Sequence, residues 1–304
     1  MPDQNVITLD LNFLGVPGAI ASYIIPHNTG VVLIECGPGS TLPALQTGLQ
    51  QNGYTVQDIT DVFLTHIHLD HAGAAGWLAQ EGARIHVHPV GAPHMLNPEK
   101  LLASAARIYG AQMETLWGEF LPVPEEKMFT LEDEEVVEVN GLRLQAIDTP
   151  GHADHHLAYL YEDLCFSGDI GGVRLADTRH LRLPMPPPEF HPIKWQTSLK
   201  RLQKLNITRI APTHYGIFSD AGWHLKQLSY LLEETQVWIK ATMASDPPVE
   251  EINAKLSVWL SHRAAEDGVP EDQIQAYEYA NPTWMSGYGI QRYWRKFYNA
   301  EQVK

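Results

Sequence analysis

The chain has 304 residues, with 21 Lys or Arg against 36 Asp or Glu, and its formal net charge at pH 7 is −15. This charge argues against a nucleic-acid-binding surface, which requires a basic face. A hydrophobic fraction of 44% and a charged fraction of 19% are typical of a globular protein with a sizeable core.

Two features predict the compartment. The first ten residues show no basic segment followed by an apolar one, and no apolar run approaches the ~20 residues of a membrane span. Cys36 and Cys165 both lie in or beside apolar runs and are expected to be reduced core residues. We therefore expect a cytoplasmic protein with no membrane or nucleic-acid partner.

The N-terminal part is predicted to form strands. Strand-like runs at 6–14, 19–25 and 31–36 are separated by Gly and Pro turns, which favours an antiparallel meander. The segment 40–52 is predicted to be helical, because it has a Pro in its first turn and a Gly at its end.

The most informative segment follows the buried strand predicted at 61–65. His66 and His68 would project to the same side of that strand, and the turn after it carries Asp70 and His71 to a neighbouring position. Imidazole and carboxylate are ligands of Zn²⁺ and similar cations. This one segment could therefore serve two adjacent metal ions.

A second pair of histidines needs a different interpretation. His86 and His88 alternate on the strand predicted at 84–88, but a proline follows them and no carboxylate joins them. We predict that they are structural or solvent-facing. The residues 90–127 after them are predicted to be a helical insertion, either a roof over a site or a plain surface excursion.

The next strands are predicted at 136–139 and 142–147, as a hairpin across Asn-Gly, and at 157–161, 164–167 and 207–211. A helix is predicted within 188–206. Three of these strands lead directly into a polar motif, which ends at His152, Asp169 and His214 respectively.

With these motifs the sequence resembles the metallo-β-lactamase superfamily. The H-x-H-x-D-H segment at 66–71, the Thr-Pro-Gly-His motif, the Ser-Gly-Asp motif and the Pro-Thr-His motif occur in the family's order. The resemblance covers about residues 5–216. It implies a four-layer αββα sandwich with a helical C-terminal addition, in which the motifs meet in a cleft at one edge.

The resemblance also implies a ligand set for two divalent metal ions, with zinc expected and iron or manganese as alternatives. One ion would be held by His66, His68 and His152, the other by Asp70, His71 and His214, with Asp169 bridging them. Asp70 is also the candidate catalytic residue, since it could take or return a proton. His155 and His156 compete with His152, but only His152 follows the Pro-Gly turn. Asp154 is either a hydrogen-bond partner of a ligand or a solvated turn residue.

The implied activity is the hydrolysis of a small acyl compound by a dinuclear metallo-hydrolase, with a thioester or lactone as the leading substrate class. The ligand set is similar to those of glyoxalase II-like thioesterases and acyl-homoserine lactonases, and it differs from drug-hydrolysing lactamases that have a cysteine ligand. Alternatives are a mononuclear iron oxygenase of the persulfide dioxygenase type, a phosphodiesterase or nuclease, and a binding protein with a silent site.

The loop at 171–190 reverses the sign of the local charge. Arg174, Arg179 and Arg182 fall within nine residues of an acidic chain. They are predicted either to clamp an anionic group of the substrate or to pair with surface acids such as those at 132–135. Arg174, which is nearest to Asp169, and Tyr215, which follows His214, are the candidate substrate-binding residues.

Beyond residue 219 the pattern becomes helical. Amphipathic helices are predicted around 225–239 and 252–260, and an aromatic-rich one at 286–300. We predict a catalytic domain at 1–219 and a helical extension at 220–304 docked on it. The aromatic density of 284–298 predicts burial against the sandwich, the site or a second subunit of a homodimer.

Overall fold

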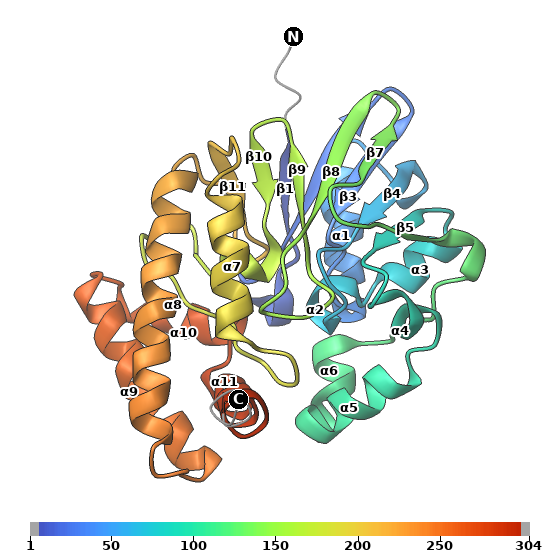
Figure 1. Cartoon of the computed structure of the whole chain (residues 1–304). Helices are drawn as coiled ribbons and strands as arrows, with labels where there is room; N and C mark the ends of the chain where they lie inside the picture. Colours follow the sequence, from blue (N-terminus) through green and yellow to red (C-terminus); the bar gives the residue numbers. More distant parts are fainter. Residues whose placement is uncertain (1–5, 299–304) are drawn as a thin grey trace.

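The structure, a computed structural model, describes residues 6–298 as two β-sheets that face each other with helices on both outer sides (Figure 1). This arrangement is the αββα sandwich that the sequence predicts. The first sheet contains β1 (Ile7–Asp10), β2 (Ala21–His27), β3 (Gly30–Ile34), β4 (Ile59–Phe63), β5 (Arg84–Val87) and β6 (Met128–Thr130), in this order. The second contains β7 (Val136–Val139), β8 (Leu142–Asp148), β9 (Leu157–Tyr161), β10 (Leu164–Phe166) and β11 (Arg209–Ala211), in the order β11-β10-β9-β8-β7.

Strand pairing follows the turn chemistry. The strands β1, β2 and β3 pair antiparallel, which confirms the predicted meander, and β3 to β6 pair in parallel. Between β7 and β8, Asn140 and Gly141 have φ angles of 47° and 90°. Two positive φ angles define the turn type that matches the twist of a hairpin, and the predicted hairpin is confirmed.

The space between the sheets is filled by inward-facing apolar side chains. Tyr23 and Phe63 of the first sheet pack with Tyr159 and Phe166 of the second, and all four are almost fully buried. These residues alternate along their strands with residues that face the outer helices. The core therefore fixes the strand ends from which the polar motifs emerge.

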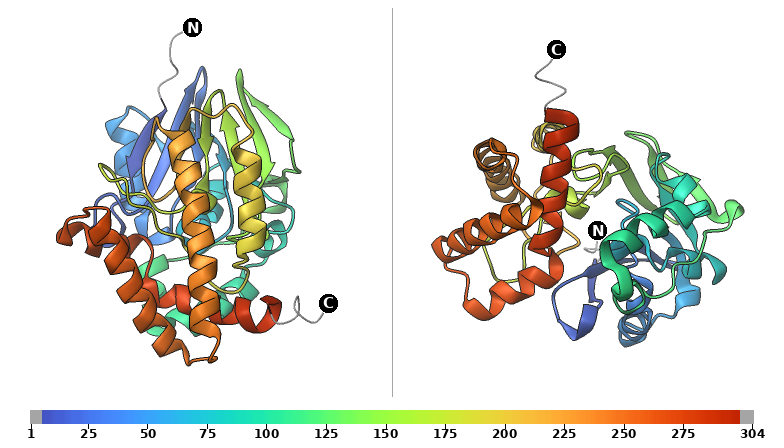
Figure 2. Two further views of the ribbon diagram at one scale, coloured as in Figure 1. Left: turned by 60° about the vertical axis from the view of Figure 1, so that its left-hand side comes forward. Right: turned by 90° about the horizontal axis from the view of Figure 1, so that it is seen from below.

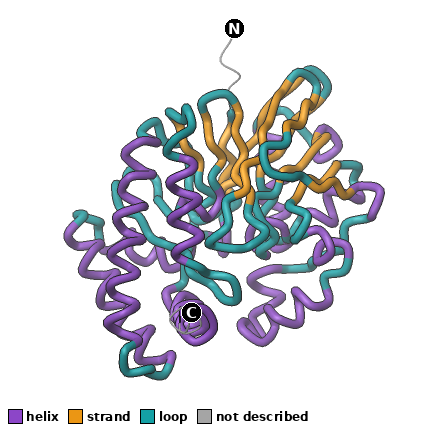
Figure 3. Tube along the Cα trace, viewed as in Figure 1, coloured by secondary structure: helices purple, strands orange, loops and turns teal. Residues whose placement is uncertain are grey.

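Helices cover both sheets on the outside (Figure 3). Over the first sheet lie α1 (Leu42–Gln51) and α3 (Ala75–Gln80), together with the predicted insertion, which folds as α4 (Ala92–Leu96), α5 (Glu99–Tyr109) and α6 (Met113–Trp117). Over the second lie α7 (Pro192–Leu202) and α8 (Ala221–Met243), whose Trp195, Leu228 and Leu232 pack in one cluster with Ile147 and Cys165 of the sheet. Cys36 and Cys165 are free and buried.

The C-terminal part continues with α9 (Val249–Glu266), α10 (Glu271–Ala280) and α11 (Thr283–Tyr293), which is followed by a π-helical turn at Trp294–Tyr298. The sequence analysis missed α10, most of whose side chains are at least partly exposed. The third helix predicted beyond residue 219, at 286–300, corresponds to α11 and the π turn. Residues 299 and 300 lie outside the described part. The division at residue 219 stays a prediction.

The helix α11 packs near the insertion. Seen from below, α11 lies beside α5 (Figure 2), and the rings of Tyr109 and Trp284 are 5.9 Å apart. Within residues 6–298, no helix is both long and apolar enough to cross a membrane.

The predicted structural role of His86 rests on a buried polar cluster that joins β5 to β4. His86 is 2.7 Å from Asp61, stacks on Phe63, and is almost fully buried. Arg84 donates a second hydrogen bond of 2.8 Å to Asp61. Burial would raise the pKa of Asp61, but the hydrogen bonds from His86 and Arg84 outweigh it and lower the pKa to about 2.

We expect Asp61→Asn to lower the free energy of unfolding at pH 7 by about 2 kcal/mol. Because the pKa of Asp61 is lower in the folded chain than the ordinary value of 3.8, its contribution is complete above that value and is lost as the pH falls toward 2. Urea unfolding at pH 7, 5 and 3 should therefore show the wild-type and variant curves converging in acid. The exposed control Glu138→Gln should change stability little at any pH. A constant gap between the curves would contradict this account.

Candidate metal centre

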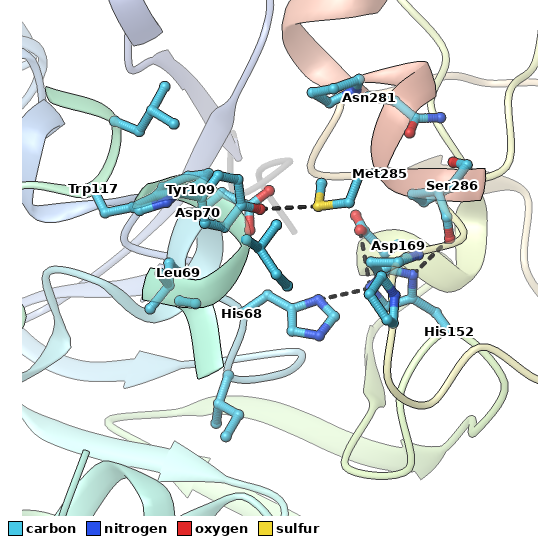
Figure 4. Close-up of a pocket in the computed structure, with 18 of the residues that line it drawn as sticks. His68, Leu69, Asp70, Tyr109, Trp117, His152, Asp169, Asn281, Met285 and Ser286 are labelled. Carbon is cyan, nitrogen blue, oxygen red and sulfur yellow. Dashed lines mark hydrogen bonds and ion pairs between the residues drawn. The ribbon is translucent and has the colours of Figure 1, made fainter. Parts of the chain in front are cut away.

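Four strand ends deliver the polar motifs to one place. The segment after β4 carries His66 and His68 into the short helix α2 (Leu69–Ala72), and the loops after β8, β10 and β11 bring His152, Asp169 and His214. Figure 4 shows His68, His152 and Asp169 facing a common space. All seven residues that the resemblance implies as ligands are brought together here.

The first group consists of three imidazoles. His68 Nδ1 lies 3.0 Å from His66 Nε2 and 2.9 Å from His152 Nε2. These atoms lie within 4.8 Å of one another, close enough to hold one cation. His66 and His152 are almost fully buried, so water cannot easily replace a ligand there.

Hydrogen bonds outside this group fix the tautomers of two of these histidines. His152 Nδ1 donates to the carbonyl oxygen of Pro184 at 2.9 Å, so Nε2 of the neutral ring carries a lone pair. The hydroxyl of Thr65 donates to Glu35 and accepts from His66 Nδ1 at 3.0 Å, so His66 Nε2 also carries a lone pair. A single proton on His68 Nδ1 can satisfy only one of them well, so a nitrogen lone pair remains for a cation.

The second group combines a carboxylate with two imidazoles. Asp70 Oδ2 lies 3.4 Å from His214 Nε2 and 3.6 Å from His71 Nε2. His214 Nδ1 donates to the carbonyl oxygen of Ala19 at 2.7 Å, and His71 Nδ1 to Glu35 at 3.0 Å. Both Nε2 atoms therefore face the carboxylates, with a proton or a cation required between them.

Asp169 lies between the two groups. Its Oδ1 is 3.4 Å from His71 Nε2 and 3.5 Å from His214 Nε2, while its Oδ2 is 3.3 Å from His152 Nε2. One carboxylate oxygen thus faces each group, which is the geometry that a bridging ligand needs.

Unsatisfied polar atoms show that the donor set fits a cation. Within the described chain, His71 Nε2 and Asp169 Oδ1 are buried and have no hydrogen-bond partner. Leaving such atoms unpaired costs about 1–3 kcal/mol each. A divalent ion coordinated by nitrogen and carboxylate oxygen would satisfy both.

The pKa shifts differ between the two groups. Burial and the neighbouring imidazoles lower the pKa of His68 to about 3, and burial likewise lowers the pKa of His66 and His152. Burial would raise the pKa of Asp70, but the charge of His71 and a hydrogen bond with His214 bring it down to about 2. The first group is therefore neutral imidazole and Asp70 is ionised. Burial opposes protonation of His71 and His214, but the carboxylates of Asp70 and Asp169 outweigh it and raise both pKa values, so a cation would displace a proton in the second group.

Glu35, which the sequence analysis missed, supports the second group. It is 1% exposed and directly follows β3 with a φ of 60°. Its carboxylate accepts hydrogen bonds from His71 Nδ1, from the backbone and hydroxyl of Thr65, and from the hydroxyl of Thr213. A charged residue at the end of the apolar run 31–34 was the available signal, since such a residue is rarely buried unless it is paired.

The competing polar residues have other roles. His156 accepts a hydrogen bond from the backbone of Ile170 at 3.3 Å and so supports the turn that carries Asp169. His155 lies in the pocket wall, 3.4 Å from Glu189. Asp154 is partly exposed and pairs with Lys194 at 2.6 Å, as a solvated turn residue would.

The expectation that Arg174 clamps the substrate needs correction. Its guanidinium pairs with Asp220 at 2.6 Å, donates to the carbonyl oxygen of Thr178, and lies 3.9 Å above the ring of Phe218. Arg174 is 5% exposed and does not line the pocket. Its positive charge is already neutralised by a carboxylate 46 residues away, which the sequence could not show.

The other two arginines of this loop are also paired with carboxylates, and Tyr215 packs away from the pocket. Arg179 lies 3.4 Å from Asp220, and the buried Arg182 pairs with Glu278 at 2.5 Å. Tyr215 is half-buried against Gly18 and the apolar clusters and does not line the pocket either. The loop therefore stabilises the protein around the site and offers no anion clamp.

Above the two groups lies a pocket of about 370 Å³ with a largely apolar wall. His68, Asp70, His152, Asp169 and His214 lie at its base, and the insertion and the start of α11 form its sides. The hydroxyl of Tyr109 approaches Met285 Sδ to 2.9 Å across it (Figure 4). The insertion thus forms one wall of the site.

Comparison with known proteins agrees with this geometry. The sequence model described as the metallo-beta-lactamase superfamily matches residues 15–214. A metallo-beta-lactamase fold-containing protein of Sulfurisphaera tokodaii is 31% identical over 235 residues, which are 75% of this chain and 85% of that protein. A hydroxyacylglutathione hydrolase of Shewanella halifaxensis is 28% identical over 143 residues, 47% of this chain and 43% of that enzyme.

A solved structure extends the likeness to the C-terminal helices. A metallo-beta-lactamase family protein of Thermus thermophilus superposes with a TM-score of 0.67 and covers 97% of this chain and 94% of its own. At 21% sequence identity this shows a shared fold only.

The position of Glu35 generates a prediction about metal affinity. We expect Glu35→Gln to weaken binding of one metal equivalent about 10–100-fold, since the amide no longer supplies the second carboxylate oxygen and charge that orient His71. Titration of the metal-free protein against a chelating indicator would measure this. Asp61→Asn is the matched control, because it also neutralises a buried carboxylate but lies outside the site. Equal affinities for Glu35→Gln and wild type would remove Glu35 from the centre.

Proposed function

This chain belongs to the metallo-β-lactamase superfamily, and from this premise we propose that it is a metal-dependent hydrolase of a small acyl compound, with a thioester as its leading substrate class. The observation that carries the proposal is the pair of ligand groups joined by Asp169. Each group offers three donor atoms, and a nucleophilic Ser or Cys is not needed for this chemistry.

We propose that His66, His68 and His152 hold one divalent ion, that Asp70, His71 and His214 hold a second, and that Asp169 bridges them. Two zinc ions are the expected occupants, with iron or manganese as alternatives. Such ions, when bound, would generate a nucleophile from water at neutral pH and polarise the substrate carbonyl.

The chain's own residues then supply proton transfer. Asp70 is the more exposed of the two site carboxylates, with 23% of its side chain accessible against 5% for Asp169. We assign it the role of taking a proton from the attacking water and returning it to the leaving sulfur. In the net reaction a carbon–oxygen bond forms, the carbon–sulfur bond breaks, and the acid and the thiol are released.

The pocket supports an acyl substrate. Ile67 and Leu69 flank the ligand histidines, and Leu101, Ala105 and Trp117 of the insertion line the wall above them. A wall of this kind favours an apolar chain and keeps bulk water from the reacting carbonyl. The hydroxyacylglutathione hydrolases among the relatives are named for an acylated thiol, which supports a thioester over other esters.

A panel of substrates tests the reaction class. The purified protein is analysed for zinc, iron and manganese and then offered thioesters, lactones and oxygen esters, both under nitrogen and in air. We expect hydrolysis of thioesters at the same rate in both atmospheres. Turnover that requires oxygen would instead indicate the iron oxygenase chemistry known on this fold, and cleavage of phosphodiesters alone would indicate the nuclease branch.

The ligand assignment predicts the effect of removing donors. His66→Ala, His68→Ala, Asp70→Ala and His71→Ala should each abolish hydrolysis and lower the metal content below about two ions per chain. Thermal unfolding should change little, because the sheets have a core of their own and do not depend on metal as a zinc finger does. His262→Ala, an exposed histidine on α9, is the control and should stay active. A fully active Asp70→Ala or His71→Ala protein would contradict the two-metal assignment.

A further inference from the structure

A second cavity adjoins the pocket. It has a volume of about 780 Å³ and is lined by residues of α5, the loop before α7, α11 and the π-helical turn that follows α11. Ile108, Pro187 and Trp284 line both cavities, so the second is an outer groove that continues the pocket toward the surface.

The charge of this outer groove is opposite to that of the chain. Four of its lining side chains are basic, namely Arg107, Arg292, Arg295 and Lys296, and none of its described lining residues is acidic. All four are exposed. In a chain with a formal charge of −15, this concentration of positive charge provides a local attraction for an anion.

Some of these cations are held in position. Arg292 Nε donates to the carbonyl oxygen of Pro188 at 3.0 Å, and Arg295 Nη2 lies 3.0 Å from Asp246. Within residues 6–298, the remaining guanidinium nitrogens of Arg292 make no hydrogen bond or ion pair with the protein, and neither does the guanidinium of Arg107. A fixed guanidinium with free donors is well suited to a phosphate, which it can bind with two parallel hydrogen bonds.

Two exposed aromatic side chains complete the groove. Trp284 and Tyr288 are 38% and 45% exposed and lie one helical turn apart on α11. Arg292 and Arg295 follow on the same face at the next two turns. Large exposed rings beside cations offer a stacking surface for a flat heterocycle.

We propose that the outer groove binds the nucleotide part of the substrate, so that the substrate is a thioester whose thiol carries phosphate groups and a purine, as coenzyme A does. This inference rests on the proposed function and specifies its leaving group. The nucleotide would lie in the groove, and the thiol arm would pass through the apolar pocket to the carboxylate–histidine centre. The nucleotide itself undergoes no reaction, since only the carbon–sulfur bond is broken.

Binding can be measured without catalysis. Adenosine 3′,5′-bisphosphate and desulfo-coenzyme A, which has no thioester, are titrated by calorimetry into wild type, Arg107→Glu and the double variant Arg292→Glu/Lys296→Glu. These side chains are chosen because reversing Arg295 would also disrupt its pair with Asp246. We expect at least tenfold weaker binding by the variants. Arg143→Glu, an exposed position next to the turn of the β7–β8 hairpin, is the control and should bind as wild type does.

The same variants are then compared on two substrates that share one acyl group, a coenzyme A thioester and a neutral N-acetylcysteamine thioester. We expect kcat/KM for the coenzyme A thioester to fall at least tenfold more than that for the neutral one. An equal loss on both substrates, or no binding of either nucleotide by wild type, would overturn the inference and leave the proposed function standing. Preference for a glutathione thioester with the same charge dependence would also overturn it. Nucleotide binding that is lost in the variants, in a protein without thioesterase activity, would support the groove and contradict the proposed function.

Discussion

The structure depends on one buried concentration of polar atoms. Histidine nitrogens and the carboxylates of Asp70 and Asp169 converge at the edge of two apolar sheets, where their lone pairs face one another. Among residues 6–298, no protein group gives His71 Nε2 or Asp169 Oδ1 a hydrogen-bond partner. Such an arrangement is costly unless a cation satisfies it, which explains why the surrounding fold is organised to hold these side chains in place.

Support comes from the opposite side of each ring. The backbone oxygens of Pro184 and Ala19 and the carboxylate of Glu35 each accept a hydrogen bond from the Nδ1–H of a histidine of the centre. These acceptors belong to segments that are far apart in the chain and are fixed by the packed strands. The sandwich thus selects the tautomer that directs Nε2 toward the centre. The rigid core therefore decides which nitrogen of each ring carries the lone pair.

The walls of the pocket come from parts of the chain that lie outside the sheets. The insertion at α4–α6 and the C-terminal helix α11 approach each other above the centre, with Tyr109 and Met285 in contact across the pocket. Their apolar inner faces shape the space above the histidines and carboxylates of the centre, and their outer faces form the basic groove. A common fold can in this way surround the same centre with a different pocket, because the walls vary independently of the residues at its base.

The sequence by itself determined the hairpin at Asn140-Gly141, because that turn depends on local residues. Through the resemblance that its four motifs carry, it also indicated the sandwich and the seven residues that converge at the centre. Only the tertiary structure decided where the long charged side chains go. Arg174 was expected at the substrate and instead pairs with Asp220, while Glu35 was overlooked and supports His71. The helix α10 and the basic groove were not foreseen either. Arg174 and Asp220 are 46 residues apart, and Glu35 and His71 are 36 apart. One-dimensional patterns carry no information about which distant partner neutralises a given charge.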